Sequence, residues 1–330
     1  MNGFSCTQSD EHMIQRLQDF LPDRIFDAHA HVFYSGYLPS GSGLCNRYGT
    51  TDAARFLEDQ KLFYGNKSVS GLLIPYPVAA LREKELRLEV NRWMAGQLDS
   101  APQCGCEIFV APSDTADEIA AQLTHPGIKG FKCYHLSADE SVKVGNADIC
   151  QYLPESAWEV AQEYGLCITV HLVKPLSLID PVNMSYIKSH AGRYPNAKLI
   201  LAHCGRGFAS YTAMEGVRQL REYQNIYYDL AAVTDPAVMF EVIRQAGINH
   251  VLWGSDYPID RAHGRTVNCG ETFAWLFNSP ELEKSGFAAN YVGLESLFAF
   301  YQACLMLDMP QSGKEAIFCD NAKNLLNMDG

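Results

Sequence analysis

Two histidines separated by one residue stand in an apolar segment, Ile25 to Phe33, which reads I-F-D-A-H-A-H-V-F. Side chains alternate between the two faces of a β-strand, so we expect Asp27, His29 and His31 to point the same way. A half-buried strand normally places apolar residues on its inner face. An acid and two imidazoles there indicate a metal or catalytic site. An H-x-H pair by itself also fits a solvated strand end, so the rest of the chain must decide.

Three further groups that could bind a metal or transfer a proton close strand-like segments elsewhere. They are His171, His203 and Asp256, which end the segments that begin at Leu166, Lys198 and His250. Imidazole and carboxylate ligands suit Zn²⁺, with Mn²⁺ or Fe²⁺ as alternatives. A bound ion would lower the pKa of a water molecule toward ~7. Asp256 could then accept the proton as a general base.

The elements that must position these residues alternate between strands and helices. The predicted strands are 25–33, 69–74, 106–110, 128–134, 166–171, 198–203, 225–230 and 250–256. The predicted helices are 10–20, 83–98, 115–123, 154–164, 183–192, 211–223 and 236–246, with helical material from there to the end. Eight such units over about 250 residues or more suit a closed (β/α)8 TIM barrel of the α/β class. An open doubly wound sheet is the alternative, but no G-x-G-x-x-G motif follows the first strand.

A barrel would bring the candidate residues together, because active sites in this fold form at the carboxyl ends of the strands. The candidates end predicted strands 1, 5, 6 and 8. We expect residues 1–24 to form an N-terminal helical extension and residues 25–330 to form one barrel domain. The segment Ser35–Gly49 is rich in Gly and Ser, which is typical of a lid or binding loop.

Several motifs together resemble the amidohydrolase superfamily, and within it the amidohydrolase-related (type 2) branch. They are D-A-H-A-H at 27–31, T-V-H at 169–171, L-A-H-C-G at 201–205, N-I-Y-Y-D-L at 225–230, W-G-S-D-Y-P at 253–258 and D-N-A-K-N-L-L at 320–326. The resemblance implies a distorted (β/α)8 barrel. It also implies a divalent metal bound by the set His29, His31, His171 and Asp256.

The same resemblance implies that His203 either polarises the substrate or water, or serves a second metal. One ion is favoured and two are allowed. The branch contains hydrolases, lactonases, hydratases and non-oxidative decarboxylases, which leaves the chemistry open.

The fourth predicted strand departs from the family pattern. Relatives often read G-F-K-x-H, whereas this chain reads G-F-K-C-Y-H, with Tyr134 at the alternating position after Lys132 and His135 one residue later. Lys132 could be an ammonium group that binds a substrate carboxylate. It could instead be a carboxylated lysine that bridges two metals, as in binuclear members of the superfamily, or it could have a structural role.

The loops after the strands suggest an anionic substrate. The chain has a formal net charge of −12, yet Lys174, Arg206, Arg261, His263 and Arg265 all follow predicted strands 5, 6 and 8. Cations at the rim of an acidic protein would attract an anion, and the planar guanidinium group suits a carboxylate. We predict substrate-binding roles for Lys174, Arg206, Tyr257 and Arg261. The substrate would be a small lactone, cyclic amide or aromatic acid; ordinary solvated loop charge is the alternative.

Composition excludes other classes of function. An acidic chain is a poor partner for nucleic acid, and no run of ~18 apolar residues predicts a membrane span. The first residues lack a secretory pattern. Eleven cysteines without compact repeating spacing fit reduced thiols in a cytoplasmic protein. Analogy of fold also suggests a homo-oligomer.

The leading hypothesis is therefore a metal-dependent hydrolase of a C–O or C–N bond, with Asp256 as general base. The alternative is a lyase of the same fold that removes CO₂ from an aromatic or enoic acid. A catalytically silent metal-binding barrel is disfavoured, because every expected ligand is present in the sequence.

Overall fold

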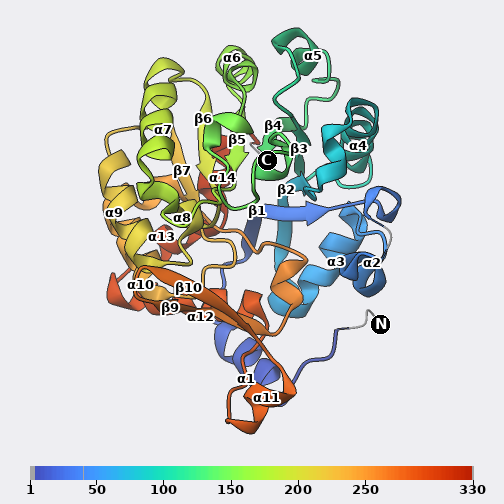
Figure 1. Ribbon diagram of the computed structural model, residues 1–330. Helices are drawn as coiled ribbons and strands as arrows, with labels where there is room; N and C mark the ends of the chain where they lie inside the picture. The colour runs from blue at the N-terminus through green and yellow to red at the C-terminus, as the bar shows by residue number, and fades with distance from the viewer. Residues whose placement is uncertain (1–3, 40, 329–330) are drawn as a thin grey trace.

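The computed structural model describes residues 4–39 and 41–328. Eight parallel strands form one sheet in chain order, and helices surround it (Figure 1). The segment after β8 lies against β1, where the Ala28 amide donates to the Trp253 carbonyl at 2.8 Å and the His31 amide to the Tyr257 carbonyl at 2.7 Å. These bonds nearly close the barrel, and the predicted (β/α)8 fold is confirmed.

All eight predicted strands are present. They are β1 (Arg24–Val32), β2 (Ser68–Pro75), β3 (Gly105–Phe109), β4 (Ile128–Cys133), β5 (Cys167–Val170), β6 (Lys198–Leu201), β7 (Ile226–Asp229) and β8 (Val251–Leu252). His171, His203 and Asp256 were predicted to end strands, but they lie just beyond them, because β5, β6 and β8 end earlier than predicted. β6 ends at Leu201, and His203 has a left-handed backbone with φ of 55°.

Helices follow the strands, and those predicted between residues 83 and 246 are present; the helix at 53–64, between β1 and β2, was not predicted. The longer ones are α1 (Gln8–Leu17), α3 (Ala53–Tyr64), α4 (Lys84–Gln97), α6 (Glu155–Tyr164), α7 (Pro181–Arg193), α9 (Ser210–Leu220), α10 (Pro236–Ala246) and α12 (Val292–Met306). The shorter ones are α2 (Gly43–Tyr48), α5 (Ala116–Ala120), α8 (Ala202–Arg206), α11 (Pro280–Lys284), α13 (Gln311–Glu315) and α14 (Asn321–Leu325). Local signals set their ends. Asp180 caps the first turn of α7, and Gly165 ends α6 with φ of 65°.

Two further segments differ from the sequence predictions. The predicted loop Ser35–Gly49 contains a short helix, Ser35–Tyr37, and α2; its residue 40 lies outside the described residues. The region after β8, predicted to be helical, contains an antiparallel hairpin of β9 (Gly264–Cys269) and β10 (Thr272–Phe277). Aromatic residues in β10 favour a strand, and Gly270 supplies the turn with φ of 65°.

The N-terminal helix is fastened to the C-terminal part of the chain. Asp10 is buried and accepts hydrogen bonds from the Tyr291 amide at 3.1 Å and His263 Nε2 at 2.8 Å. Arg16 lies over the ring of Phe298 on α12, 4.9 Å from its centre. Residues 1–3 of the predicted extension and 329–330 of the predicted barrel lie outside the described residues.

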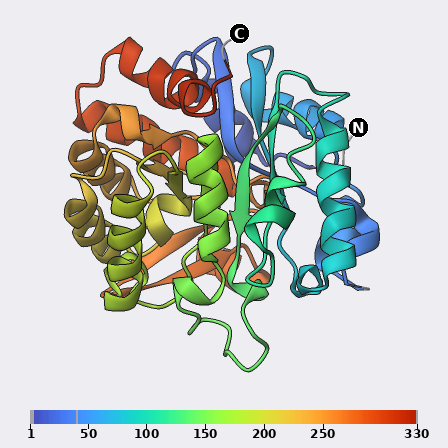
Figure 2. The ribbon, with the colours of Figure 1, turned by 90° about the horizontal axis from the view of Figure 1, so that it is seen from above.

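The two ends of the barrel carry different elements. In Figure 2 the hairpin (orange) and the long loop after β4 (green) lie at one end, and the C-terminus lies at the other. Consecutive strand residues such as Ile168 and Thr169 are fully buried, so both faces of the strands are covered. Across the residues that the structure describes, every helix is too short or too polar to cross a membrane.

Candidate active site

A cavity of about 240 Å³ opens beside the carboxyl ends of the strands. Six of the residues singled out in the sequence line it: His29, His31, Lys132, His171, His203 and Asp256. They come from β1, β4 and the segments after β5, β6 and β8. The fold therefore brings together side chains that are far apart in the chain.

Three of these side chains form a compact group. His29 Nε2 and His31 Nε2 lie 3.2 Å apart. Asp256 Oδ1 lies 3.7 Å from the first nitrogen and 3.6 Å from the second. A tetrahedral zinc ion with bonds of ~2.0–2.1 Å holds its ligands about 3.3 Å apart. The separations in this group therefore fit three ligands on one divalent ion.

The hydrogen bond of His29 to Asp229 determines which ring nitrogen is free to bind a metal. Its Nδ1 lies 2.9 Å from Asp229 Oδ2, and a carboxylate oxygen only accepts, so Nδ1 carries the proton. The lone pair of Nε2 then faces the cavity. A carboxylate behind a histidine ligand orients the ring and raises its basicity.

Asp229 was not singled out as a site residue from the sequence. The signal that could have found it is its place at the end of the predicted seventh strand, the position that the other candidates share. His29, His203 and Asp229 also lie close enough together to suggest a second metal group. However, Asp229 already accepts from the His29 ring and from the His203 amide, at 2.9 and 2.8 Å. We therefore assign it a supporting position.

His203 is oriented in a similar way. Its Nδ1 lies 2.8 Å from the carbonyl of Ala231, which only accepts, so the ring keeps its proton there and presents Nε2 to the cavity. His171 lines the same cavity, with its ring centre 5.0 Å from that of His203. It is not part of the compact group of three.

Burial sets the charge of these groups. It lowers the pKa values of His29, His31 and His171 well below the usual range, and that of His203 to about 4. The imidazoles are therefore neutral and can act as ligands. Burial raises the pKa of Asp256, while the charge of Lys132 opposes this shift. A bound cation would also favour the carboxylate, so the donor set fits a divalent metal.

The segment that carries Asp256 is held against β1. The Asp256 amide donates to the His29 carbonyl at 2.9 Å, and Asp256 itself has φ of 64°. Asp27 accepts hydrogen bonds from the amides of Ser255, at 2.9 Å, and His29, at 3.1 Å. The strand register shifts between Asp27 and Ala30. Asp27 thus ties the two ligand-bearing segments together and is not one of the compact ligand group.

Lys132 and Glu107 lie beneath the compact group. Lys132 Nζ is 3.4 Å from His29 Nε2, and burial lowers its pKa. Glu107 is fully buried on β3 and accepts a hydrogen bond from Thr169 Oγ1 at 2.6 Å. Burial raises the pKa of Glu107 to about 7, although the Lys132 charge opposes the shift. Glu107 is a further polar residue of the site that the sequence did not reveal.

The family model described as "Amidohydrolase" matches residues 26–328. The chain belongs to the amidohydrolase family. This confirms the resemblance found in the sequence motifs. Members of the family are enzymes, either hydrolases or decarboxylases, that bind a divalent metal. A search of curated proteins found no significant match.

Solved structures share the fold at low sequence identity. One is a provisionally named 2-pyrone-4,6-dicarboxylic acid hydrolase from Pseudomonas putida (TM-score 0.59, 14% identity, covering 94% of this chain and 100% of that one). Another is a 5-carboxyvanillate decarboxylase from Sphingomonas paucimobilis (0.58, 15%, 93% and 100%). A third is an amidohydrolase from Burkholderia multivorans with bound zinc (0.59, 13%, 92% and 99%).

None of the four predicted substrate-binding residues in this amidohydrolase lines the cavity, but the charge of Arg206 acts on two of its histidines. This charge contributes to lowering the pKa values of His171 and His203, after burial. The guanidinium carbon lies 5.2 Å from the ring centre of Phe273 on β10. Its Nε has no hydrogen-bond partner among the described residues.

The other three predicted substrate-binding residues are held by contacts within the fold. Arg261 is fully buried, because the chain after Asp256 turns inward; it lies 3.8 Å from the ring centre of Phe63. The hydroxyl of Tyr257 donates to Asp59 at 2.7 Å. The ammonium group of Lys174 pairs with Asp148 at 2.6 Å and Asp180 at 2.8 Å. These positions give no support to a role in substrate binding.

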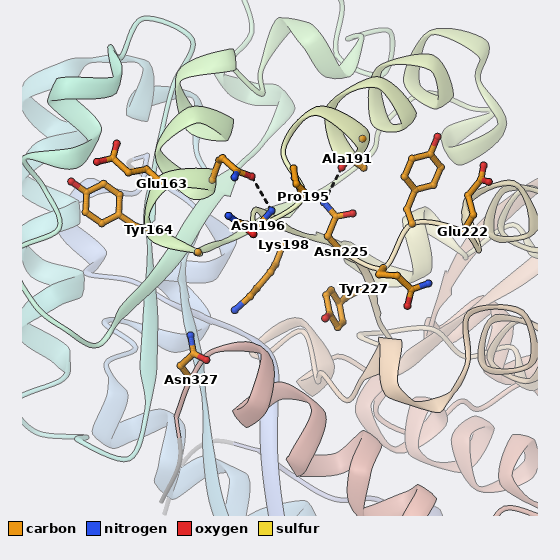
Figure 3. Close-up of a pocket in the computed structure, with 15 residues that line it drawn as sticks. Glu163, Tyr164, Ala191, Pro195, Asn196, Lys198, Glu222, Asn225, Tyr227 and Asn327 are labelled. Carbon is orange, nitrogen blue, oxygen red and sulfur yellow. Dashed lines mark hydrogen bonds between the residues drawn. The ribbon is translucent and has the colours of Figure 1, made fainter.

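A larger hollow of about 670 Å³ lies at the opposite end of the barrel (Figure 3). Its walls come from the segments that precede β5, β6 and β7, and include Tyr164, Lys198 and Asn225. None of the candidate catalytic or metal-binding residues lines it.

Proposed function

We propose that the protein is a metal-dependent hydrolase that cleaves a C–O or C–N bond of a lactone, ester or cyclic amide. The observation that carries this proposal is the compact arrangement of His29, His31 and Asp256 in one cavity. His29 and His31 supply neutral imidazole ligands for a metal ion. Asp256 supplies a carboxylate close to the position of a water molecule bound to that ion.

A bound divalent ion would polarise the scissile group and lower the pKa of a water molecule toward ~7. Asp256 is placed to accept the proton of the attacking water and return it to the leaving oxygen or nitrogen. His203 is neutral and protonated on Nδ1, so its Nε2 can accept a hydrogen bond from that water. In this state it cannot donate a proton to a substrate carbonyl.

The cavity limits the size of the substrate. A cavity of about 150 Å³ holds benzene, so about 240 Å³ admits a single ring with small substituents. Arg206, whose charge acts on His171 and His203, supplies a cation near the cavity, and a guanidinium group suits a carboxylate. We infer a monocyclic, carboxylated substrate.

We infer one zinc ion, because two imidazoles and one carboxylate are typical of catalytic zinc. Mn²⁺ or Fe²⁺ would fit the same donors. Lys132 decides between one and two ions: an ammonium group could bind a substrate carboxylate, whereas a carboxylated lysine could bridge two metals. Metal analysis of the purified protein separates these cases, since two equivalents would support the bridging role.

A metal-dependent decarboxylase is the second candidate. The observation that favours it is the apolar and aromatic wall formed by Tyr76, Tyr134, Leu136 and Ile259, which would shield a planar acid from water. The metal would then hold the oxygen atoms of an aromatic or enoic acid.

One experiment separates the two candidates. The zinc-loaded protein is incubated with panels of lactones and of hydroxybenzoates, and acid release and CO₂ are followed in parallel. Hydrolysis predicts acid from lactones without CO₂, and Asp256→Asn should lower that rate about 10²–10⁴-fold. Asp117→Asn, an exposed acid on α5, is the matched control and should leave the rate unchanged. CO₂ without acid release would reject the hydrolase.

We also infer a cytoplasmic location. In support, the cysteines of the described chain are free thiols, several of them buried in strands.

A further inference from the structure

The hairpin after β8 forms a small sheet outside the barrel (Figure 1). One side of it is fastened to the loop after β7. The Thr266 amide on β9 donates to Thr234 Oγ1 at 3.1 Å, and Arg265 donates to the Thr234 carbonyl at 3.2 Å. In the part of the chain that the structure describes, β10 pairs with β9 alone and has no strand on its other side. β10 is therefore an open edge strand.

The backbone groups along this edge belong to Phe273, Trp275 and Phe277. Residues that face each other in an antiparallel pair alternate between hydrogen-bonded and non-hydrogen-bonded pairs. The Asn278 amide donates to the His263 carbonyl at 3.0 Å, which continues the ladder one residue past Phe277. Every second residue back from Asn278 therefore bonds β9. The three aromatic residues between them present their amide and carbonyl groups to the open edge.

The strand has none of the residues that usually protect a sheet edge. Exposed edges in soluble proteins commonly carry charged residues, often lysine, or proline. β10 reads T-F-A-W-L-F and contains neither. The side chains of Thr272, Ala274 and Phe277 are exposed. An uncharged edge of this kind, in a chain with a net charge of −12, favours pairing with another strand.

The aromatic side chains themselves pack toward the barrel. The ring centre of Phe208 lies 5.3 Å from that of Phe273 and 5.2 Å from that of Trp275. Phe208 in turn contacts the ring of His203, with the centres 5.0 Å apart. Phe273 and Trp275 are half-buried by these contacts. The backbone edge, rather than the aromatic face, is what remains available to a partner.

We propose that β10 pairs with β10 of a second copy of this chain, in an antiparallel arrangement about a twofold axis at Trp275. The aromatic residues are evenly spaced about this centre, so Phe273 would lie opposite the partner's Phe277. A twofold interface requires such self-complementarity, and cross-strand aromatic pairs stabilise a ladder. The homo-oligomer expected from the sequence would then be a dimer held by this edge.

The same register brings no like charges together. Glu271, the charged residue nearest to the strand in the sequence, would lie opposite the partner's Ser279, and Thr272 opposite the partner's Asn278. Two chains with a net charge of −12 repel each other, so an uncharged surface is the favourable place for them to meet. Sequence symmetry and charge thus both favour a second copy as the occupant of the edge.

The test is the oligomeric state of the full chain, measured by analytical ultracentrifugation over a series of protein concentrations. The unmodified protein should be a dimer in equilibrium with monomer. Ala274→Lys should raise the dissociation constant at least about fivefold, because the two lysines would be diagonal neighbours across the axis and like charges there are destabilising. Cys269→Lys adds the same charge at the exposed end of β9. It is the matched control and should leave the constant within about twofold.

A charge-swap experiment tests the register directly. Ala274→Glu should also dimerise weakly by itself. Mixed with Ala274→Lys, it should form a heterodimer at least about fivefold tighter than either variant alone, because opposite charges then meet across the axis. A folding defect in either variant would not produce this rescue.

Three outcomes would overturn the proposal. The first is a monomer at every concentration, which would leave an extended peptide of another protein as the occupant of the edge. The second is a dimer that Ala274→Lys does not weaken. The third is a mixture of the two variants without rescue.

Discussion

The two ends of the barrel differ in what their polar side chains do. The hollow at the amino ends of the strands is the larger, about 670 Å³ against about 240 Å³ at the carboxyl ends. Its polar groups, however, serve the fold. Asn225 donates to the carbonyl of Ala191 at 3.1 Å (Figure 3) and to those of Tyr194 and Ala197 at 3.0 Å. Lys198 donates to the carbonyl of Leu325.

At the carboxyl ends, the polar groups point at one another and at open space. The imidazole nitrogens of His29 and His31 lie 3.2 Å apart, and Asp256 Oδ1 lies 3.7 and 3.6 Å from them. The size of a cavity therefore does not identify the functional site. The site is marked instead by donor atoms from separate strands that converge on one cavity, at spacings that fit a bound ion.

The sharpest test of this comparison removes one group from each end. His31→Ala should lower zinc affinity by more than ~100-fold, because losing a residue that merely supports a ligand already costs ~10–100-fold. Lys198→Ala, in the larger hollow, should leave zinc affinity within twofold. Competition with a chromophoric chelator measures both. If the two variants bound zinc equally well, the assignment of the metal site would be wrong.

A second test uses the buried acid beneath the site. Glu107, with its pKa raised to about 7, keeps its proton in the folded state and loses it on unfolding above pH ~4.5. The folded state therefore binds more protons, and the free energy of unfolding should fall as pH rises from 4.5 to 7. Glu107→Gln should remove this fall, so its stability relative to the unmodified protein should increase by up to about 3 kcal/mol over that range.

Urea denaturation of chelator-treated protein at several pH values checks this expectation. Glu281→Gln, an acid in the first turn of the exposed helix α11, is the control and should leave the pH dependence unchanged. A parallel pH dependence in Glu107→Gln and the unmodified protein would show that this carboxyl does not titrate as inferred.

The smallest effect is expected in the larger hollow. Asn225→Ala should lower the free energy of unfolding by about 2 kcal/mol, because it removes the donor shared by three backbone carbonyls. Zinc affinity should not change. Gln224→Ala, at the exposed neighbouring position, should leave stability within about 0.5 kcal/mol. A loss of zinc affinity in Asn225→Ala would contradict the assignment of metal binding to the carboxyl end alone.

The barrel could be predicted because its signals are local. Each strand is a short apolar run, and each is followed by helical periodicity, as for Leu166–Val170 before Pro181–Arg193. The hairpin Gly264–Phe277 was missed, because its strands lie outside the barrel and break the strand–helix alternation on which the prediction depended.

The sequence by itself also determined which side chains would meet. Parallel strands end at one rim, so the residues that close them, His31 and Asp256 among them, must gather there. Only the tertiary structure decided how each is used. Asp27 bonds Ser255 rather than facing the cavity, since the strand register shifts beside it. Arg261 packs on Phe63, because the chain turns inward after Asp256. Spacing along the chain cannot give such directions, since they depend on contacts between segments that fold together from far apart.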